Sequence, residues 1–260
     1  MNQNAIQTAA QTVWRHWNEA TRMDALPADC RPANRAEAYA IQAELERISG
    51  QSRRGWKIAA TSIAGQNHIG VDGPLAGRLL SKRVLTGGAT VSLDGNLMRV
   101  AEAEFTFQFG KSLPKRAQAY SMDEVLAAVE SLHCAIEVPD SRYHDFVRVG
   151  APQLIADNAC ASWYLLGEAV SADWRSLNLA EHKLMAALNG APVAEGIGAN
   201  ALGDPRVALT WLANELNTFA DGLLASEIVT TGTCITPVPI VPGDRLRVDF
   251  GVLGEIEAFF

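Results

Sequence analysis

The sequence has few cysteines, no excess of positive charge and no long apolar run. Its four cysteines, Cys30, Cys134, Cys160 and Cys234, stand far apart and form no CxxC pair, which argues against a zinc knuckle or a disulfide framework. The chain has 22 basic and 29 acidic residues, and its net charge of −7 argues against a nucleic-acid-binding face. No stretch approaches the ~20 apolar residues of a membrane span, and the N-terminus lacks a signal-peptide pattern. We therefore expect a cytoplasmic protein that binds neither nucleic acid nor membrane.

Several motifs of large enzyme classes are missing as well. The sequence contains no P-loop, GxGxxG fingerprint, GxSxG elbow or HExxH helix. These absences argue against nucleotide-dependent, serine-hydrolase and zincin chemistry. At 260 residues and 48% hydrophobic composition, the chain is long enough to bury a sizeable core.

Three glutamates stand in apolar surroundings. Glu102 and Glu104 are two residues apart in the run 99–107, so an extended strand places both carboxylates on one face. Glu137 lies in a second short apolar run, where an acid is out of place. Oxygen ligands of this kind suit a hard divalent cation with positions open for water or substrate. The alternative interpretation is a solvated edge strand, because Glu-x-Glu is common.

A lysine interrupts the apolar run 55–61. Lys57 either extends its ammonium outward to water or lies inside with carboxylates as partners. In the second case Lys57 is a candidate general acid/base, and the pattern alone favours the first.

The helix signals are clear and concentrate near the N-terminus. We predict helices from about residue 5 to 22 and from 35 to 49, the second capped by Asn34 and ended by Gly50. Ser121 opens another with a capping box, and Asp204-Pro205 starts a fourth. We expect residues 1–50 to form a helical segment packed on the body and residues 51–260 to form the catalytic domain.

The strand predictions follow turn signals. Residues 62–77 are rich in Gly and Pro and predict a loop that covers a site; this loop carries His68 and Asp72. Strands are predicted at 84–91 and 97–109, joined by a turn at Asp94-Gly95, and an Asn189-Gly190 turn predicts a hairpin. A further strand is predicted at 227–236.

Two more segments are candidate site elements. Asp157 lies against the apolar run 154–156, either as a fourth carboxylate near the site or as a local turn cap. Thr230-Thr231-Gly232-Thr233 is a small-residue kink whose hydroxyl and N–H groups suit a small carboxylate, although a β-bulge explains it equally well.

Taken together, these segments resemble a known family. They occur in the order expected for the 2-keto-4-pentenoate hydratase and 4-oxalocrotonate decarboxylase branch of the fumarylacetoacetate hydrolase superfamily, from about residue 30 to the C-terminus. The matching segments are Gly55-Trp56-Lys57-Ile58, Gly70-Val71-Asp72-Gly73-Pro74, Glu102-Ala103-Glu104, Ile136-Glu137-Val138-Pro139-Asp140-Ser141-Arg142, Ala156-Asp157-Asn158-Ala159, Thr231-Gly232-Thr233, Pro242-Gly243-Asp244 and Asp249-Phe250-Gly251.

The resemblance implies an α+β fold, mixed and mostly β, with flanking helices. It also implies Mg²⁺ or Mn²⁺ bound by Glu102, Glu104 and Glu137, with Lys57 as acid/base in the same cavity. Asp157 is assigned with Lys57 to catalysis; His68, Asp72, Thr231, Gly232 and Thr233 are assigned to substrate binding. One departure is Cys160-Ala161, where this branch often has small hydroxyl residues.

The activity implied by the resemblance is that of a metal-dependent hydro-lyase on a small 2-oxo acid in aromatic catabolism. The first candidate is hydration of 2-hydroxypenta-2,4-dienoate to 4-hydroxy-2-oxopentanoate. The alternatives are a 4-oxalocrotonate-type decarboxylase, a C–C hydrolase of an acylpyruvate, and a non-catalytic partner subunit. Trp14 and Trp17 together with the β-rich body suggest a homo-oligomer, and a pathway partner enzyme is a further possibility.

Overall fold

The computed structural model describes residues 1–260. The α-helices are α1 (Gln3–Glu19), α2 (Arg35–Ser49), α3 (Ile63–Ile69), α4 (Met122–Ala128), α5 (Ala151–Ala156) and α6 (Pro205–Phe219). The strands are β1 (Arg53–Ala59), β2 (Leu75–Leu80), β3 (Val84–Thr86), β4 (Val100–Phe109), β5 (Leu113–Pro114), β6 (Val129–Val138), β7 (Trp163–Ala169), β8 (Lys183–Leu188), β9 (Ala191–Ile197), β10 (Gly222–Leu223), β11 (Ile228–Thr230), β12 (Val238–Pro239), β13 (Arg245–Asp249) and β14 (Glu255–Phe259).

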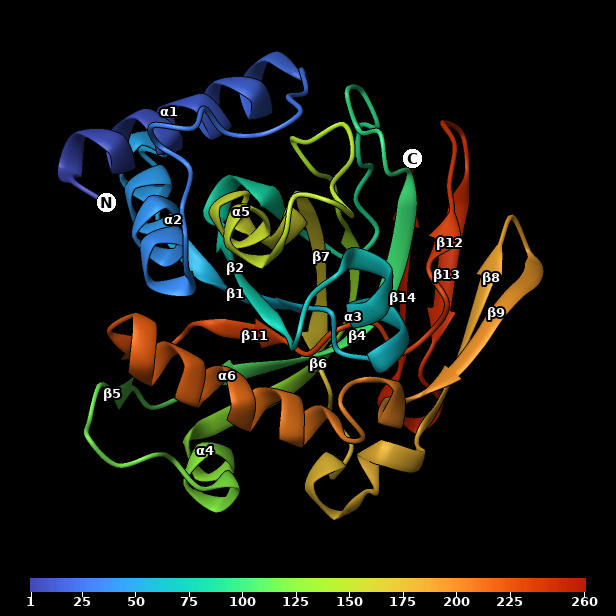
Figure 1. The fold of residues 1–260 in the computed structure, drawn as a ribbon. Helices are drawn as coiled ribbons and strands as arrows, with labels where there is room; N and C mark the ends of the chain where they lie inside the picture. The colour runs from blue at the N-terminus through green and yellow to red at the C-terminus, as the bar shows by residue number, and fades with distance from the viewer.

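An eight-stranded mixed sheet forms the centre of the molecule. Its strand order is β2-β1-β11-β4-β6-β7-β3, with β12 also paired to β4. Two neighbouring pairs, β1 with β11 and β3 with β7, run parallel, and the remaining pairs are antiparallel. A second, four-stranded antiparallel sheet has the order β14-β13-β8-β9. Figure 1 shows the β8–β9 hairpin on the side of the molecule opposite α1 and α2.

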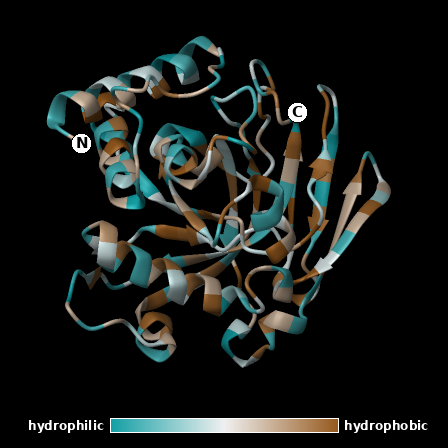
Figure 2. Cartoon of the chain, viewed as in Figure 1, coloured by the Kyte–Doolittle hydropathy of each residue, from teal (hydrophilic) through white to brown (hydrophobic).

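The two N-terminal helices pack on the body. α1 lies against α2, and α2 lies against α5 and β2. Most of α1 is hydrophilic in Figure 2, and its shorter apolar stretches supply the buried Ala9, Ala10, Val13 and Trp17. These four residues belong to one core cluster that also contains most of the buried apolar residues of the central sheet. The division of the chain at residue 50 into a helical segment and a catalytic domain stays a prediction. No helix has both the length and the apolarity to cross a membrane.

Local sequence signals placed three helix starts and one hairpin correctly, whereas the helix predicted at about 5–22 runs from Gln3 to Glu19. The Asn34 side chain accepts from the Glu37 N–H, and Ser121 forms the predicted capping box with Glu124. Asp204 caps α6. The hairpin of β8 and β9 turns at residues 189–190, where both backbone φ angles are positive.

The predicted loop at 62–77 is wrong in two parts. Residues 63–69 form the helix α3, because the Ser62 side chain accepts from the Gly65 N–H and Gly70 ends the helix at a φ of 64°. Residues 75–77 belong to β2, which pairs with β1. Only the connection between α3 and β2 remains irregular.

The predicted strands at 84–91 and 227–236 are shorter in the structure. β3 ends at Thr86 and pairs with β7 rather than with β4, so the turn at Asp94-Gly95 does not join a hairpin. β11 ends at Thr230, since Gly232 adopts a φ of +95° that a strand does not contain. The lengths of β3 and β11 depend on which strands pair in the folded chain, and the local sequence does not determine this pairing.

Candidate metal centre

Three carboxylates meet on one face of the central sheet. Glu102 of β4 is directly opposite Glu137 of β6 in the antiparallel register, and Glu104 is two residues further along β4. Side chains paired in this way, or two apart on a strand, leave the sheet on the same side. One carboxylate oxygen from each residue lies within 4.8 Å of the others. The predicted convergence of these acids is present in the structure.

Several carboxylate oxygens of this cluster accept no hydrogen bond. Glu104 and Glu137 are buried, and Glu102 is partly exposed. Oε1 of Glu104 and Oε2 of Glu137 have no partner, and Oε1 of Glu137 has only the Lys57 ammonium nearby, although buried polar atoms rarely remain without a partner. A divalent cation satisfies such oxygens, so the donor set fits a hard metal ion. The three glutamates form a group able to bind one.

The pKa values of the three acids reflect the same crowding. Burial, followed by the charge of Glu137, raises the pKa of Glu102 to about 7. Burial and the two neighbouring carboxylates hold the pKa of Glu104 well above its ordinary value. Burial also raises the pKa of Glu137, and the Lys57 ammonium opposes that rise. Without a metal ion, the cluster therefore tends to retain protons near neutral pH.

We predict that Glu102→Gln stabilises the metal-free protein more at pH 8 than at pH 5. The folded-state pKa of Glu102 is raised, so between about pH 4.5 and 7 the folded state binds more protons than the unfolded chain. Stability contributed by this group therefore falls as pH rises, and a neutral glutamine avoids that loss, which is at most about 3 kcal/mol. Thermal unfolding of chelator-treated wild type and variant across this range measures it. A gain at pH 5 equal to that at pH 8 contradicts the prediction.

Lys57 is buried and faces the carboxylates. Its Nζ lies 3.2 Å from Oε1 of Glu137 and donates to the carbonyl oxygen of Ala159 at 3.0 Å. The outward orientation that the sequence pattern favoured is therefore wrong, and only 3% of the side chain is exposed. Burial lowers the pKa of Lys57, but Glu137 and Glu102 raise it by more, so the net pKa lies above its ordinary value. The ammonium form is the favoured one beside the metal-free cluster.

The turn after β11 holds Glu104 in place. Oε2 of Glu104 accepts from the Thr230 hydroxyl and, at 2.9 Å, from the Gly232 N–H. Thr230 is the first residue of the kink that the sequence singled out, and its hydroxyl is engaged by Glu104. A Cβ on Gly232 would lie 2.1 Å from Oγ1 of Thr61, so glycine is required there for space as well as for φ.

The other two residues of this kink point elsewhere. The Thr231 hydroxyl donates to the Phe105 carbonyl at 3.0 Å, which ties the turn to β4. The Thr233 hydroxyl donates to the Ile235 carbonyl at 2.8 Å, and this residue is only half-buried. Neither hydroxyl proton is free in this arrangement; the Gly232 N–H is used by Glu104.

Asp157 does not join the carboxylate cluster. Its oxygens accept from the Ser141 hydroxyl at 2.7 Å, from the Arg142 N–H at 3.0 Å and from the Arg142 guanidinium. Arg142 also donates to the Asp157 carbonyl oxygen, and both residues are buried. Asp157 is outside the group of three acids, and its contacts fit the alternative of a local structural role; its assignment to catalysis stays a prediction. Arg142 is a partner that the sequence did not reveal.

A strained turn follows Asp157 and reaches Lys57. Asn158, Ala159 and Cys160 all have φ between 49° and 61°, a left-handed conformation that non-glycine residues rarely adopt in succession. The Asn158 side chain accepts from the Arg78 N–H and donates to its carbonyl, both at 2.7 Å. This clamp aims the Ala159 carbonyl at Nζ of Lys57.

The close approach of this turn restricts the residue type at position 77, and burial determines the protonation state of Cys160. A Cβ on Gly77, which is opposite Lys57 in β2, would lie 2.2 Å from the Asn158 carbonyl oxygen, so only glycine allows the turn to approach. Burial raises the pKa of the Cys160 thiol to about 12, which keeps it neutral. This thiol stands where the family resemblance led us to expect a hydroxyl.

His68 and Asp72 lie at the surface on and after α3. Both are exposed, and the His68 ring contacts the Phe146 ring edge-on at 6.3 Å between centroids. The structure brings neither into hydrogen-bond contact with the three glutamates or Lys57. Their assignment to substrate binding stays a prediction.

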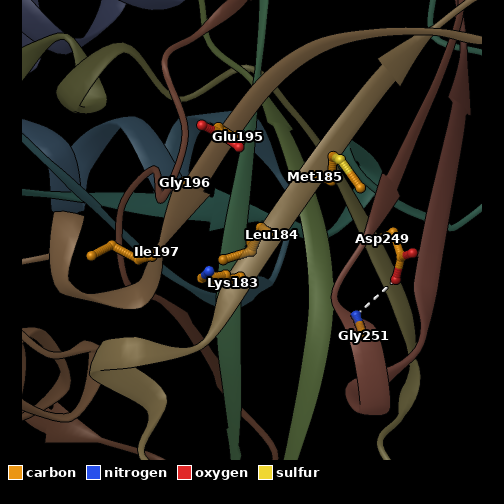
Figure 3. Close-up of a pocket in the computed structure, with 8 residues that line it drawn as sticks. All are labelled: Lys183, Leu184, Met185, Glu195, Gly196, Ile197, Asp249 and Gly251. Carbon is orange, nitrogen blue, oxygen red and sulfur yellow. Dashed lines mark hydrogen bonds between the residues drawn. The ribbon is translucent and has the colours of Figure 1, made fainter.

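A hollow on the surface lies away from the three glutamates. It has a volume of about 550 Å³ and lies on β8, β9 and the end of β13, where Lys183, Glu195 and Asp249 line it (Figure 3). The Asp249 carboxylate accepts from the Gly251 N–H at 2.7 Å. None of its lining residues belongs to the carboxylate cluster, and its charged groups do not converge on one point in Figure 3. The metal centre is therefore the better candidate site.

Comparisons with known proteins agree with the family resemblance. Residues 81–259 match the model of the fumarylacetoacetate (FAA) hydrolase C-terminal domain. The chain is 31% identical to a 2-hydroxyhexa-2,4-dienoate hydratase of Comamonas testosteroni, over 92% of this chain and 91% of the relative. It is 30% identical to a 4-oxalocrotonate decarboxylase of Pseudomonas sp. (strain CF600), over 86% and 85%.

A solved structure supports the same conclusion. The 4-oxalocrotonate decarboxylase from Pseudomonas putida G7, complexed with magnesium and adipate, superposes with a TM-score of 0.90 at 26% identity. The match covers 100% of this chain and 98% of that one, so the N-terminal helices are included. The predicted mixed sheet with flanking helices is thereby confirmed. This chain belongs to the fumarylacetoacetate hydrolase family, in the branch of the dienoate hydratases and 4-oxalocrotonate decarboxylases.

Proposed function

We propose that this protein is a metal-dependent hydro-lyase that hydrates 2-hydroxypenta-2,4-dienoate to 4-hydroxy-2-oxopentanoate. The observation that carries the proposal is the group of three convergent carboxylates, with unpartnered oxygens, beside the buried ammonium of Lys57. Relatives named as hydratases of such dienoates support the choice of substrate class.

Glu102, Glu104 and Glu137 are the proposed metal ligands. We assign Mg²⁺ or Mn²⁺ to them because all three donors are carboxylate oxygens, which hard cations prefer. When bound, such a cation supplies Lewis-acid stabilisation of negative charge on the C2 oxygen of a 2-oxo acid. Thr230 and Gly232 fix Glu104 by engaging its Oε2 and leave Oε1 free for ligation.

Lys57 is the proposed proton carrier. Ketonisation of the dienol places a proton on C5 and yields an α,β-unsaturated ketone; water then adds at C4 and a proton at C3. An ammonium held at one point beside the ligands is suited to give such a proton and to take one back. Its burial keeps bulk water away from this exchange.

We propose a different role for Asp157 from the direct one first expected. Its oxygens are engaged by Arg142 and Ser141, so it is better suited to position the turn that holds Lys57 than to transfer a proton. The Thr231-Gly232-Thr233 turn remains the proposed contact for the substrate carboxylate; to donate to it, the Thr233 hydroxyl exchanges its present partner, the Ile235 carbonyl, for the substrate. His68 and Asp72, exposed on and after α3, are proposed to reach substrate only from the outer end of the pocket.

The experiment is a turnover assay with the purified protein. We expect conversion of 2-hydroxypenta-2,4-dienoate, followed by loss of its ultraviolet absorbance and by NMR of the product, and dependent on added Mg²⁺ or Mn²⁺. Decarboxylation of 2-oxohex-3-enedioate is the second candidate, favoured by the full-length likeness to the P. putida G7 decarboxylase. Turnover of that compound, or of an acylpyruvate, with none of the dienoate rejects the hydratase assignment. Absence of any metal-dependent turnover leaves a non-catalytic subunit.

We also propose that the protein forms a homo-oligomer. The outer face of the second sheet exposes the apolar side chains of Met185, Val193 and Ile197, and apolar patches of this kind mark association sites. The pathway partner enzyme and the cytoplasmic location stay predictions.

A further inference from the structure

A second, smaller hollow lies at the end of α1. Its volume is about 160 Å³, and its walls combine the arginines Arg22, Arg83 and Arg142 with the indoles of Trp17 and Trp163. It lies between the end of α1, the residue before β3 and the start of β7, and contains none of the proposed metal ligands.

The cations and rings of this hollow alternate in a stack. The Arg142 guanidinium carbon lies 4.2 Å from the Trp17 ring centroid. The Arg83 guanidinium carbon lies 5.5 Å from the Trp17 centroid and 4.3 Å from the Trp163 centroid. Two positive groups therefore share one indole, an arrangement that holds both guanidinium groups in fixed positions at the wall.

Arg83 is the arginine of this hollow whose positive charge is not balanced by a carboxylate. Arg142 is paired with Asp157, and Arg22 is paired with Asp140. Arg83 has no carboxylate partner, and burial and the nearby Arg142 charge lower the pKa of its guanidinium. Asp94, the remaining acid of the lining, is exposed and accepts from the Ser92 hydroxyl. One cation inside the hollow is thus left without a counterion.

Further donors are free around the same space. Nε of Arg22 is buried and makes no hydrogen bond, although the other nitrogens of this guanidinium are engaged. The Ser162 hydroxyl also lines the hollow and has no partner in the chain. Unpartnered donors around a fixed cation create a demand for an acceptor with negative charge.

We propose that this hollow binds a small monocarboxylate. The carboxylate lies against the Arg83 guanidinium, within reach of the Ser162 hydroxyl and Nε of Arg22. The planar fork of arginine matches a carboxylate. A single charge is favoured over phosphate because Arg83 is one uncompensated cation and Asp94 lies on the lining.

The test is a titration of metal-free protein with acetate, followed by tryptophan fluorescence, because Trp17 and Trp163 line the hollow. Sodium chloride at equal ionic strength is the reference. We expect a saturable change with acetate in the millimolar range and none with chloride. Arg83→Met weakens the apparent affinity at least about tenfold, and Ser162→Ala weakens it by about threefold or more. Lys82→Met, an exposed neighbour, leaves the affinity unchanged.

Several outcomes overturn the proposal. They are the absence of a saturable signal in wild type, an unchanged affinity in both Arg83→Met and Ser162→Ala, and tighter binding of inorganic phosphate than of acetate. Sedimentation supplies the last test: if Arg83→Met lowers the oligomeric mass, the counterion of Arg83 is a carboxylate of a second copy and not a free ligand. If Arg83→Met does not fold, Ser162→Ala decides alone. Because the titration is done without metal and without turnover, its result is independent of the proposed activity.

Discussion

Replacing Glu104 by glutamine is expected to abolish metal binding and turnover together. Glu104 is fully buried, and its Oε1 has no donor while Oε2 accepts from Thr230 and Gly232. Glutamine keeps the volume but removes the charge, and its amide nitrogen cannot accept from these donors or ligate a cation. We expect Mg²⁺ affinity to fall by about 100-fold or more and kcat/KM by about 10³-fold.

Calorimetric titration of Mg²⁺ into chelator-treated protein measures the first loss, and the dienoate assay measures the second. Glu195→Gln is the matched control, because Glu195 is an exposed acid outside the cluster. Mg²⁺-dependent turnover at the wild-type rate in Glu104→Gln means that the three carboxylates are not the metal site.

Lys57→Met is expected to separate metal binding from proton transfer. Methionine fills a similar volume in the buried position and removes the ammonium that lies 3.2 Å from Glu137. Loss of a competing positive charge leaves Mg²⁺ affinity equal to or higher than that of wild type. Loss of the proton carrier lowers kcat by about 10²- to 10⁴-fold.

Incorporation of solvent deuterium at C3 of 2-oxopentanoate, detected by NMR, measures the proton transfer separately from full turnover. Lys183→Met, on the exposed outer sheet, serves as the control. If Lys57→Met still exchanges this proton at the wild-type rate, the lysine only neutralises the buried acids.

The starts of α2 and α4 could be predicted because the contacts that cap them are local. Asn34 and Ser121 hold N–H groups three residues away, and these contacts form whatever the rest of the chain does. The same local signal stood at Ser62 and Gly70, but the glycines around α3 hid a helix of only seven residues. Short helices depend on their tertiary surroundings more than on their own sequence.

The two acids on β4 could be placed on one face because strand periodicity fixes it. That Glu137 faces Glu102, however, is a matter of register between β4 and β6. A shift by one residue would turn Glu137 to the opposite face, and no nearby turn sets this register from the sequence. The apolar run around Glu137 singled out this acid in the sequence, and the pairing of β6 with β4 brings it opposite Glu102.

The sequence alone determined the composition of the site: a hard-cation set of carboxylates, one lysine within an apolar run, and a flexible glycine in the final kink. The tertiary structure decided which groups stay free. In the folded chain Lys57 is buried and Asp157 pairs with Arg142. The Thr230 hydroxyl donates to Glu104, and Arg83 has no carboxylate partner. These outcomes depend on contacts between residues far apart in the chain, because the free energy of a charge is set by what surrounds it after folding.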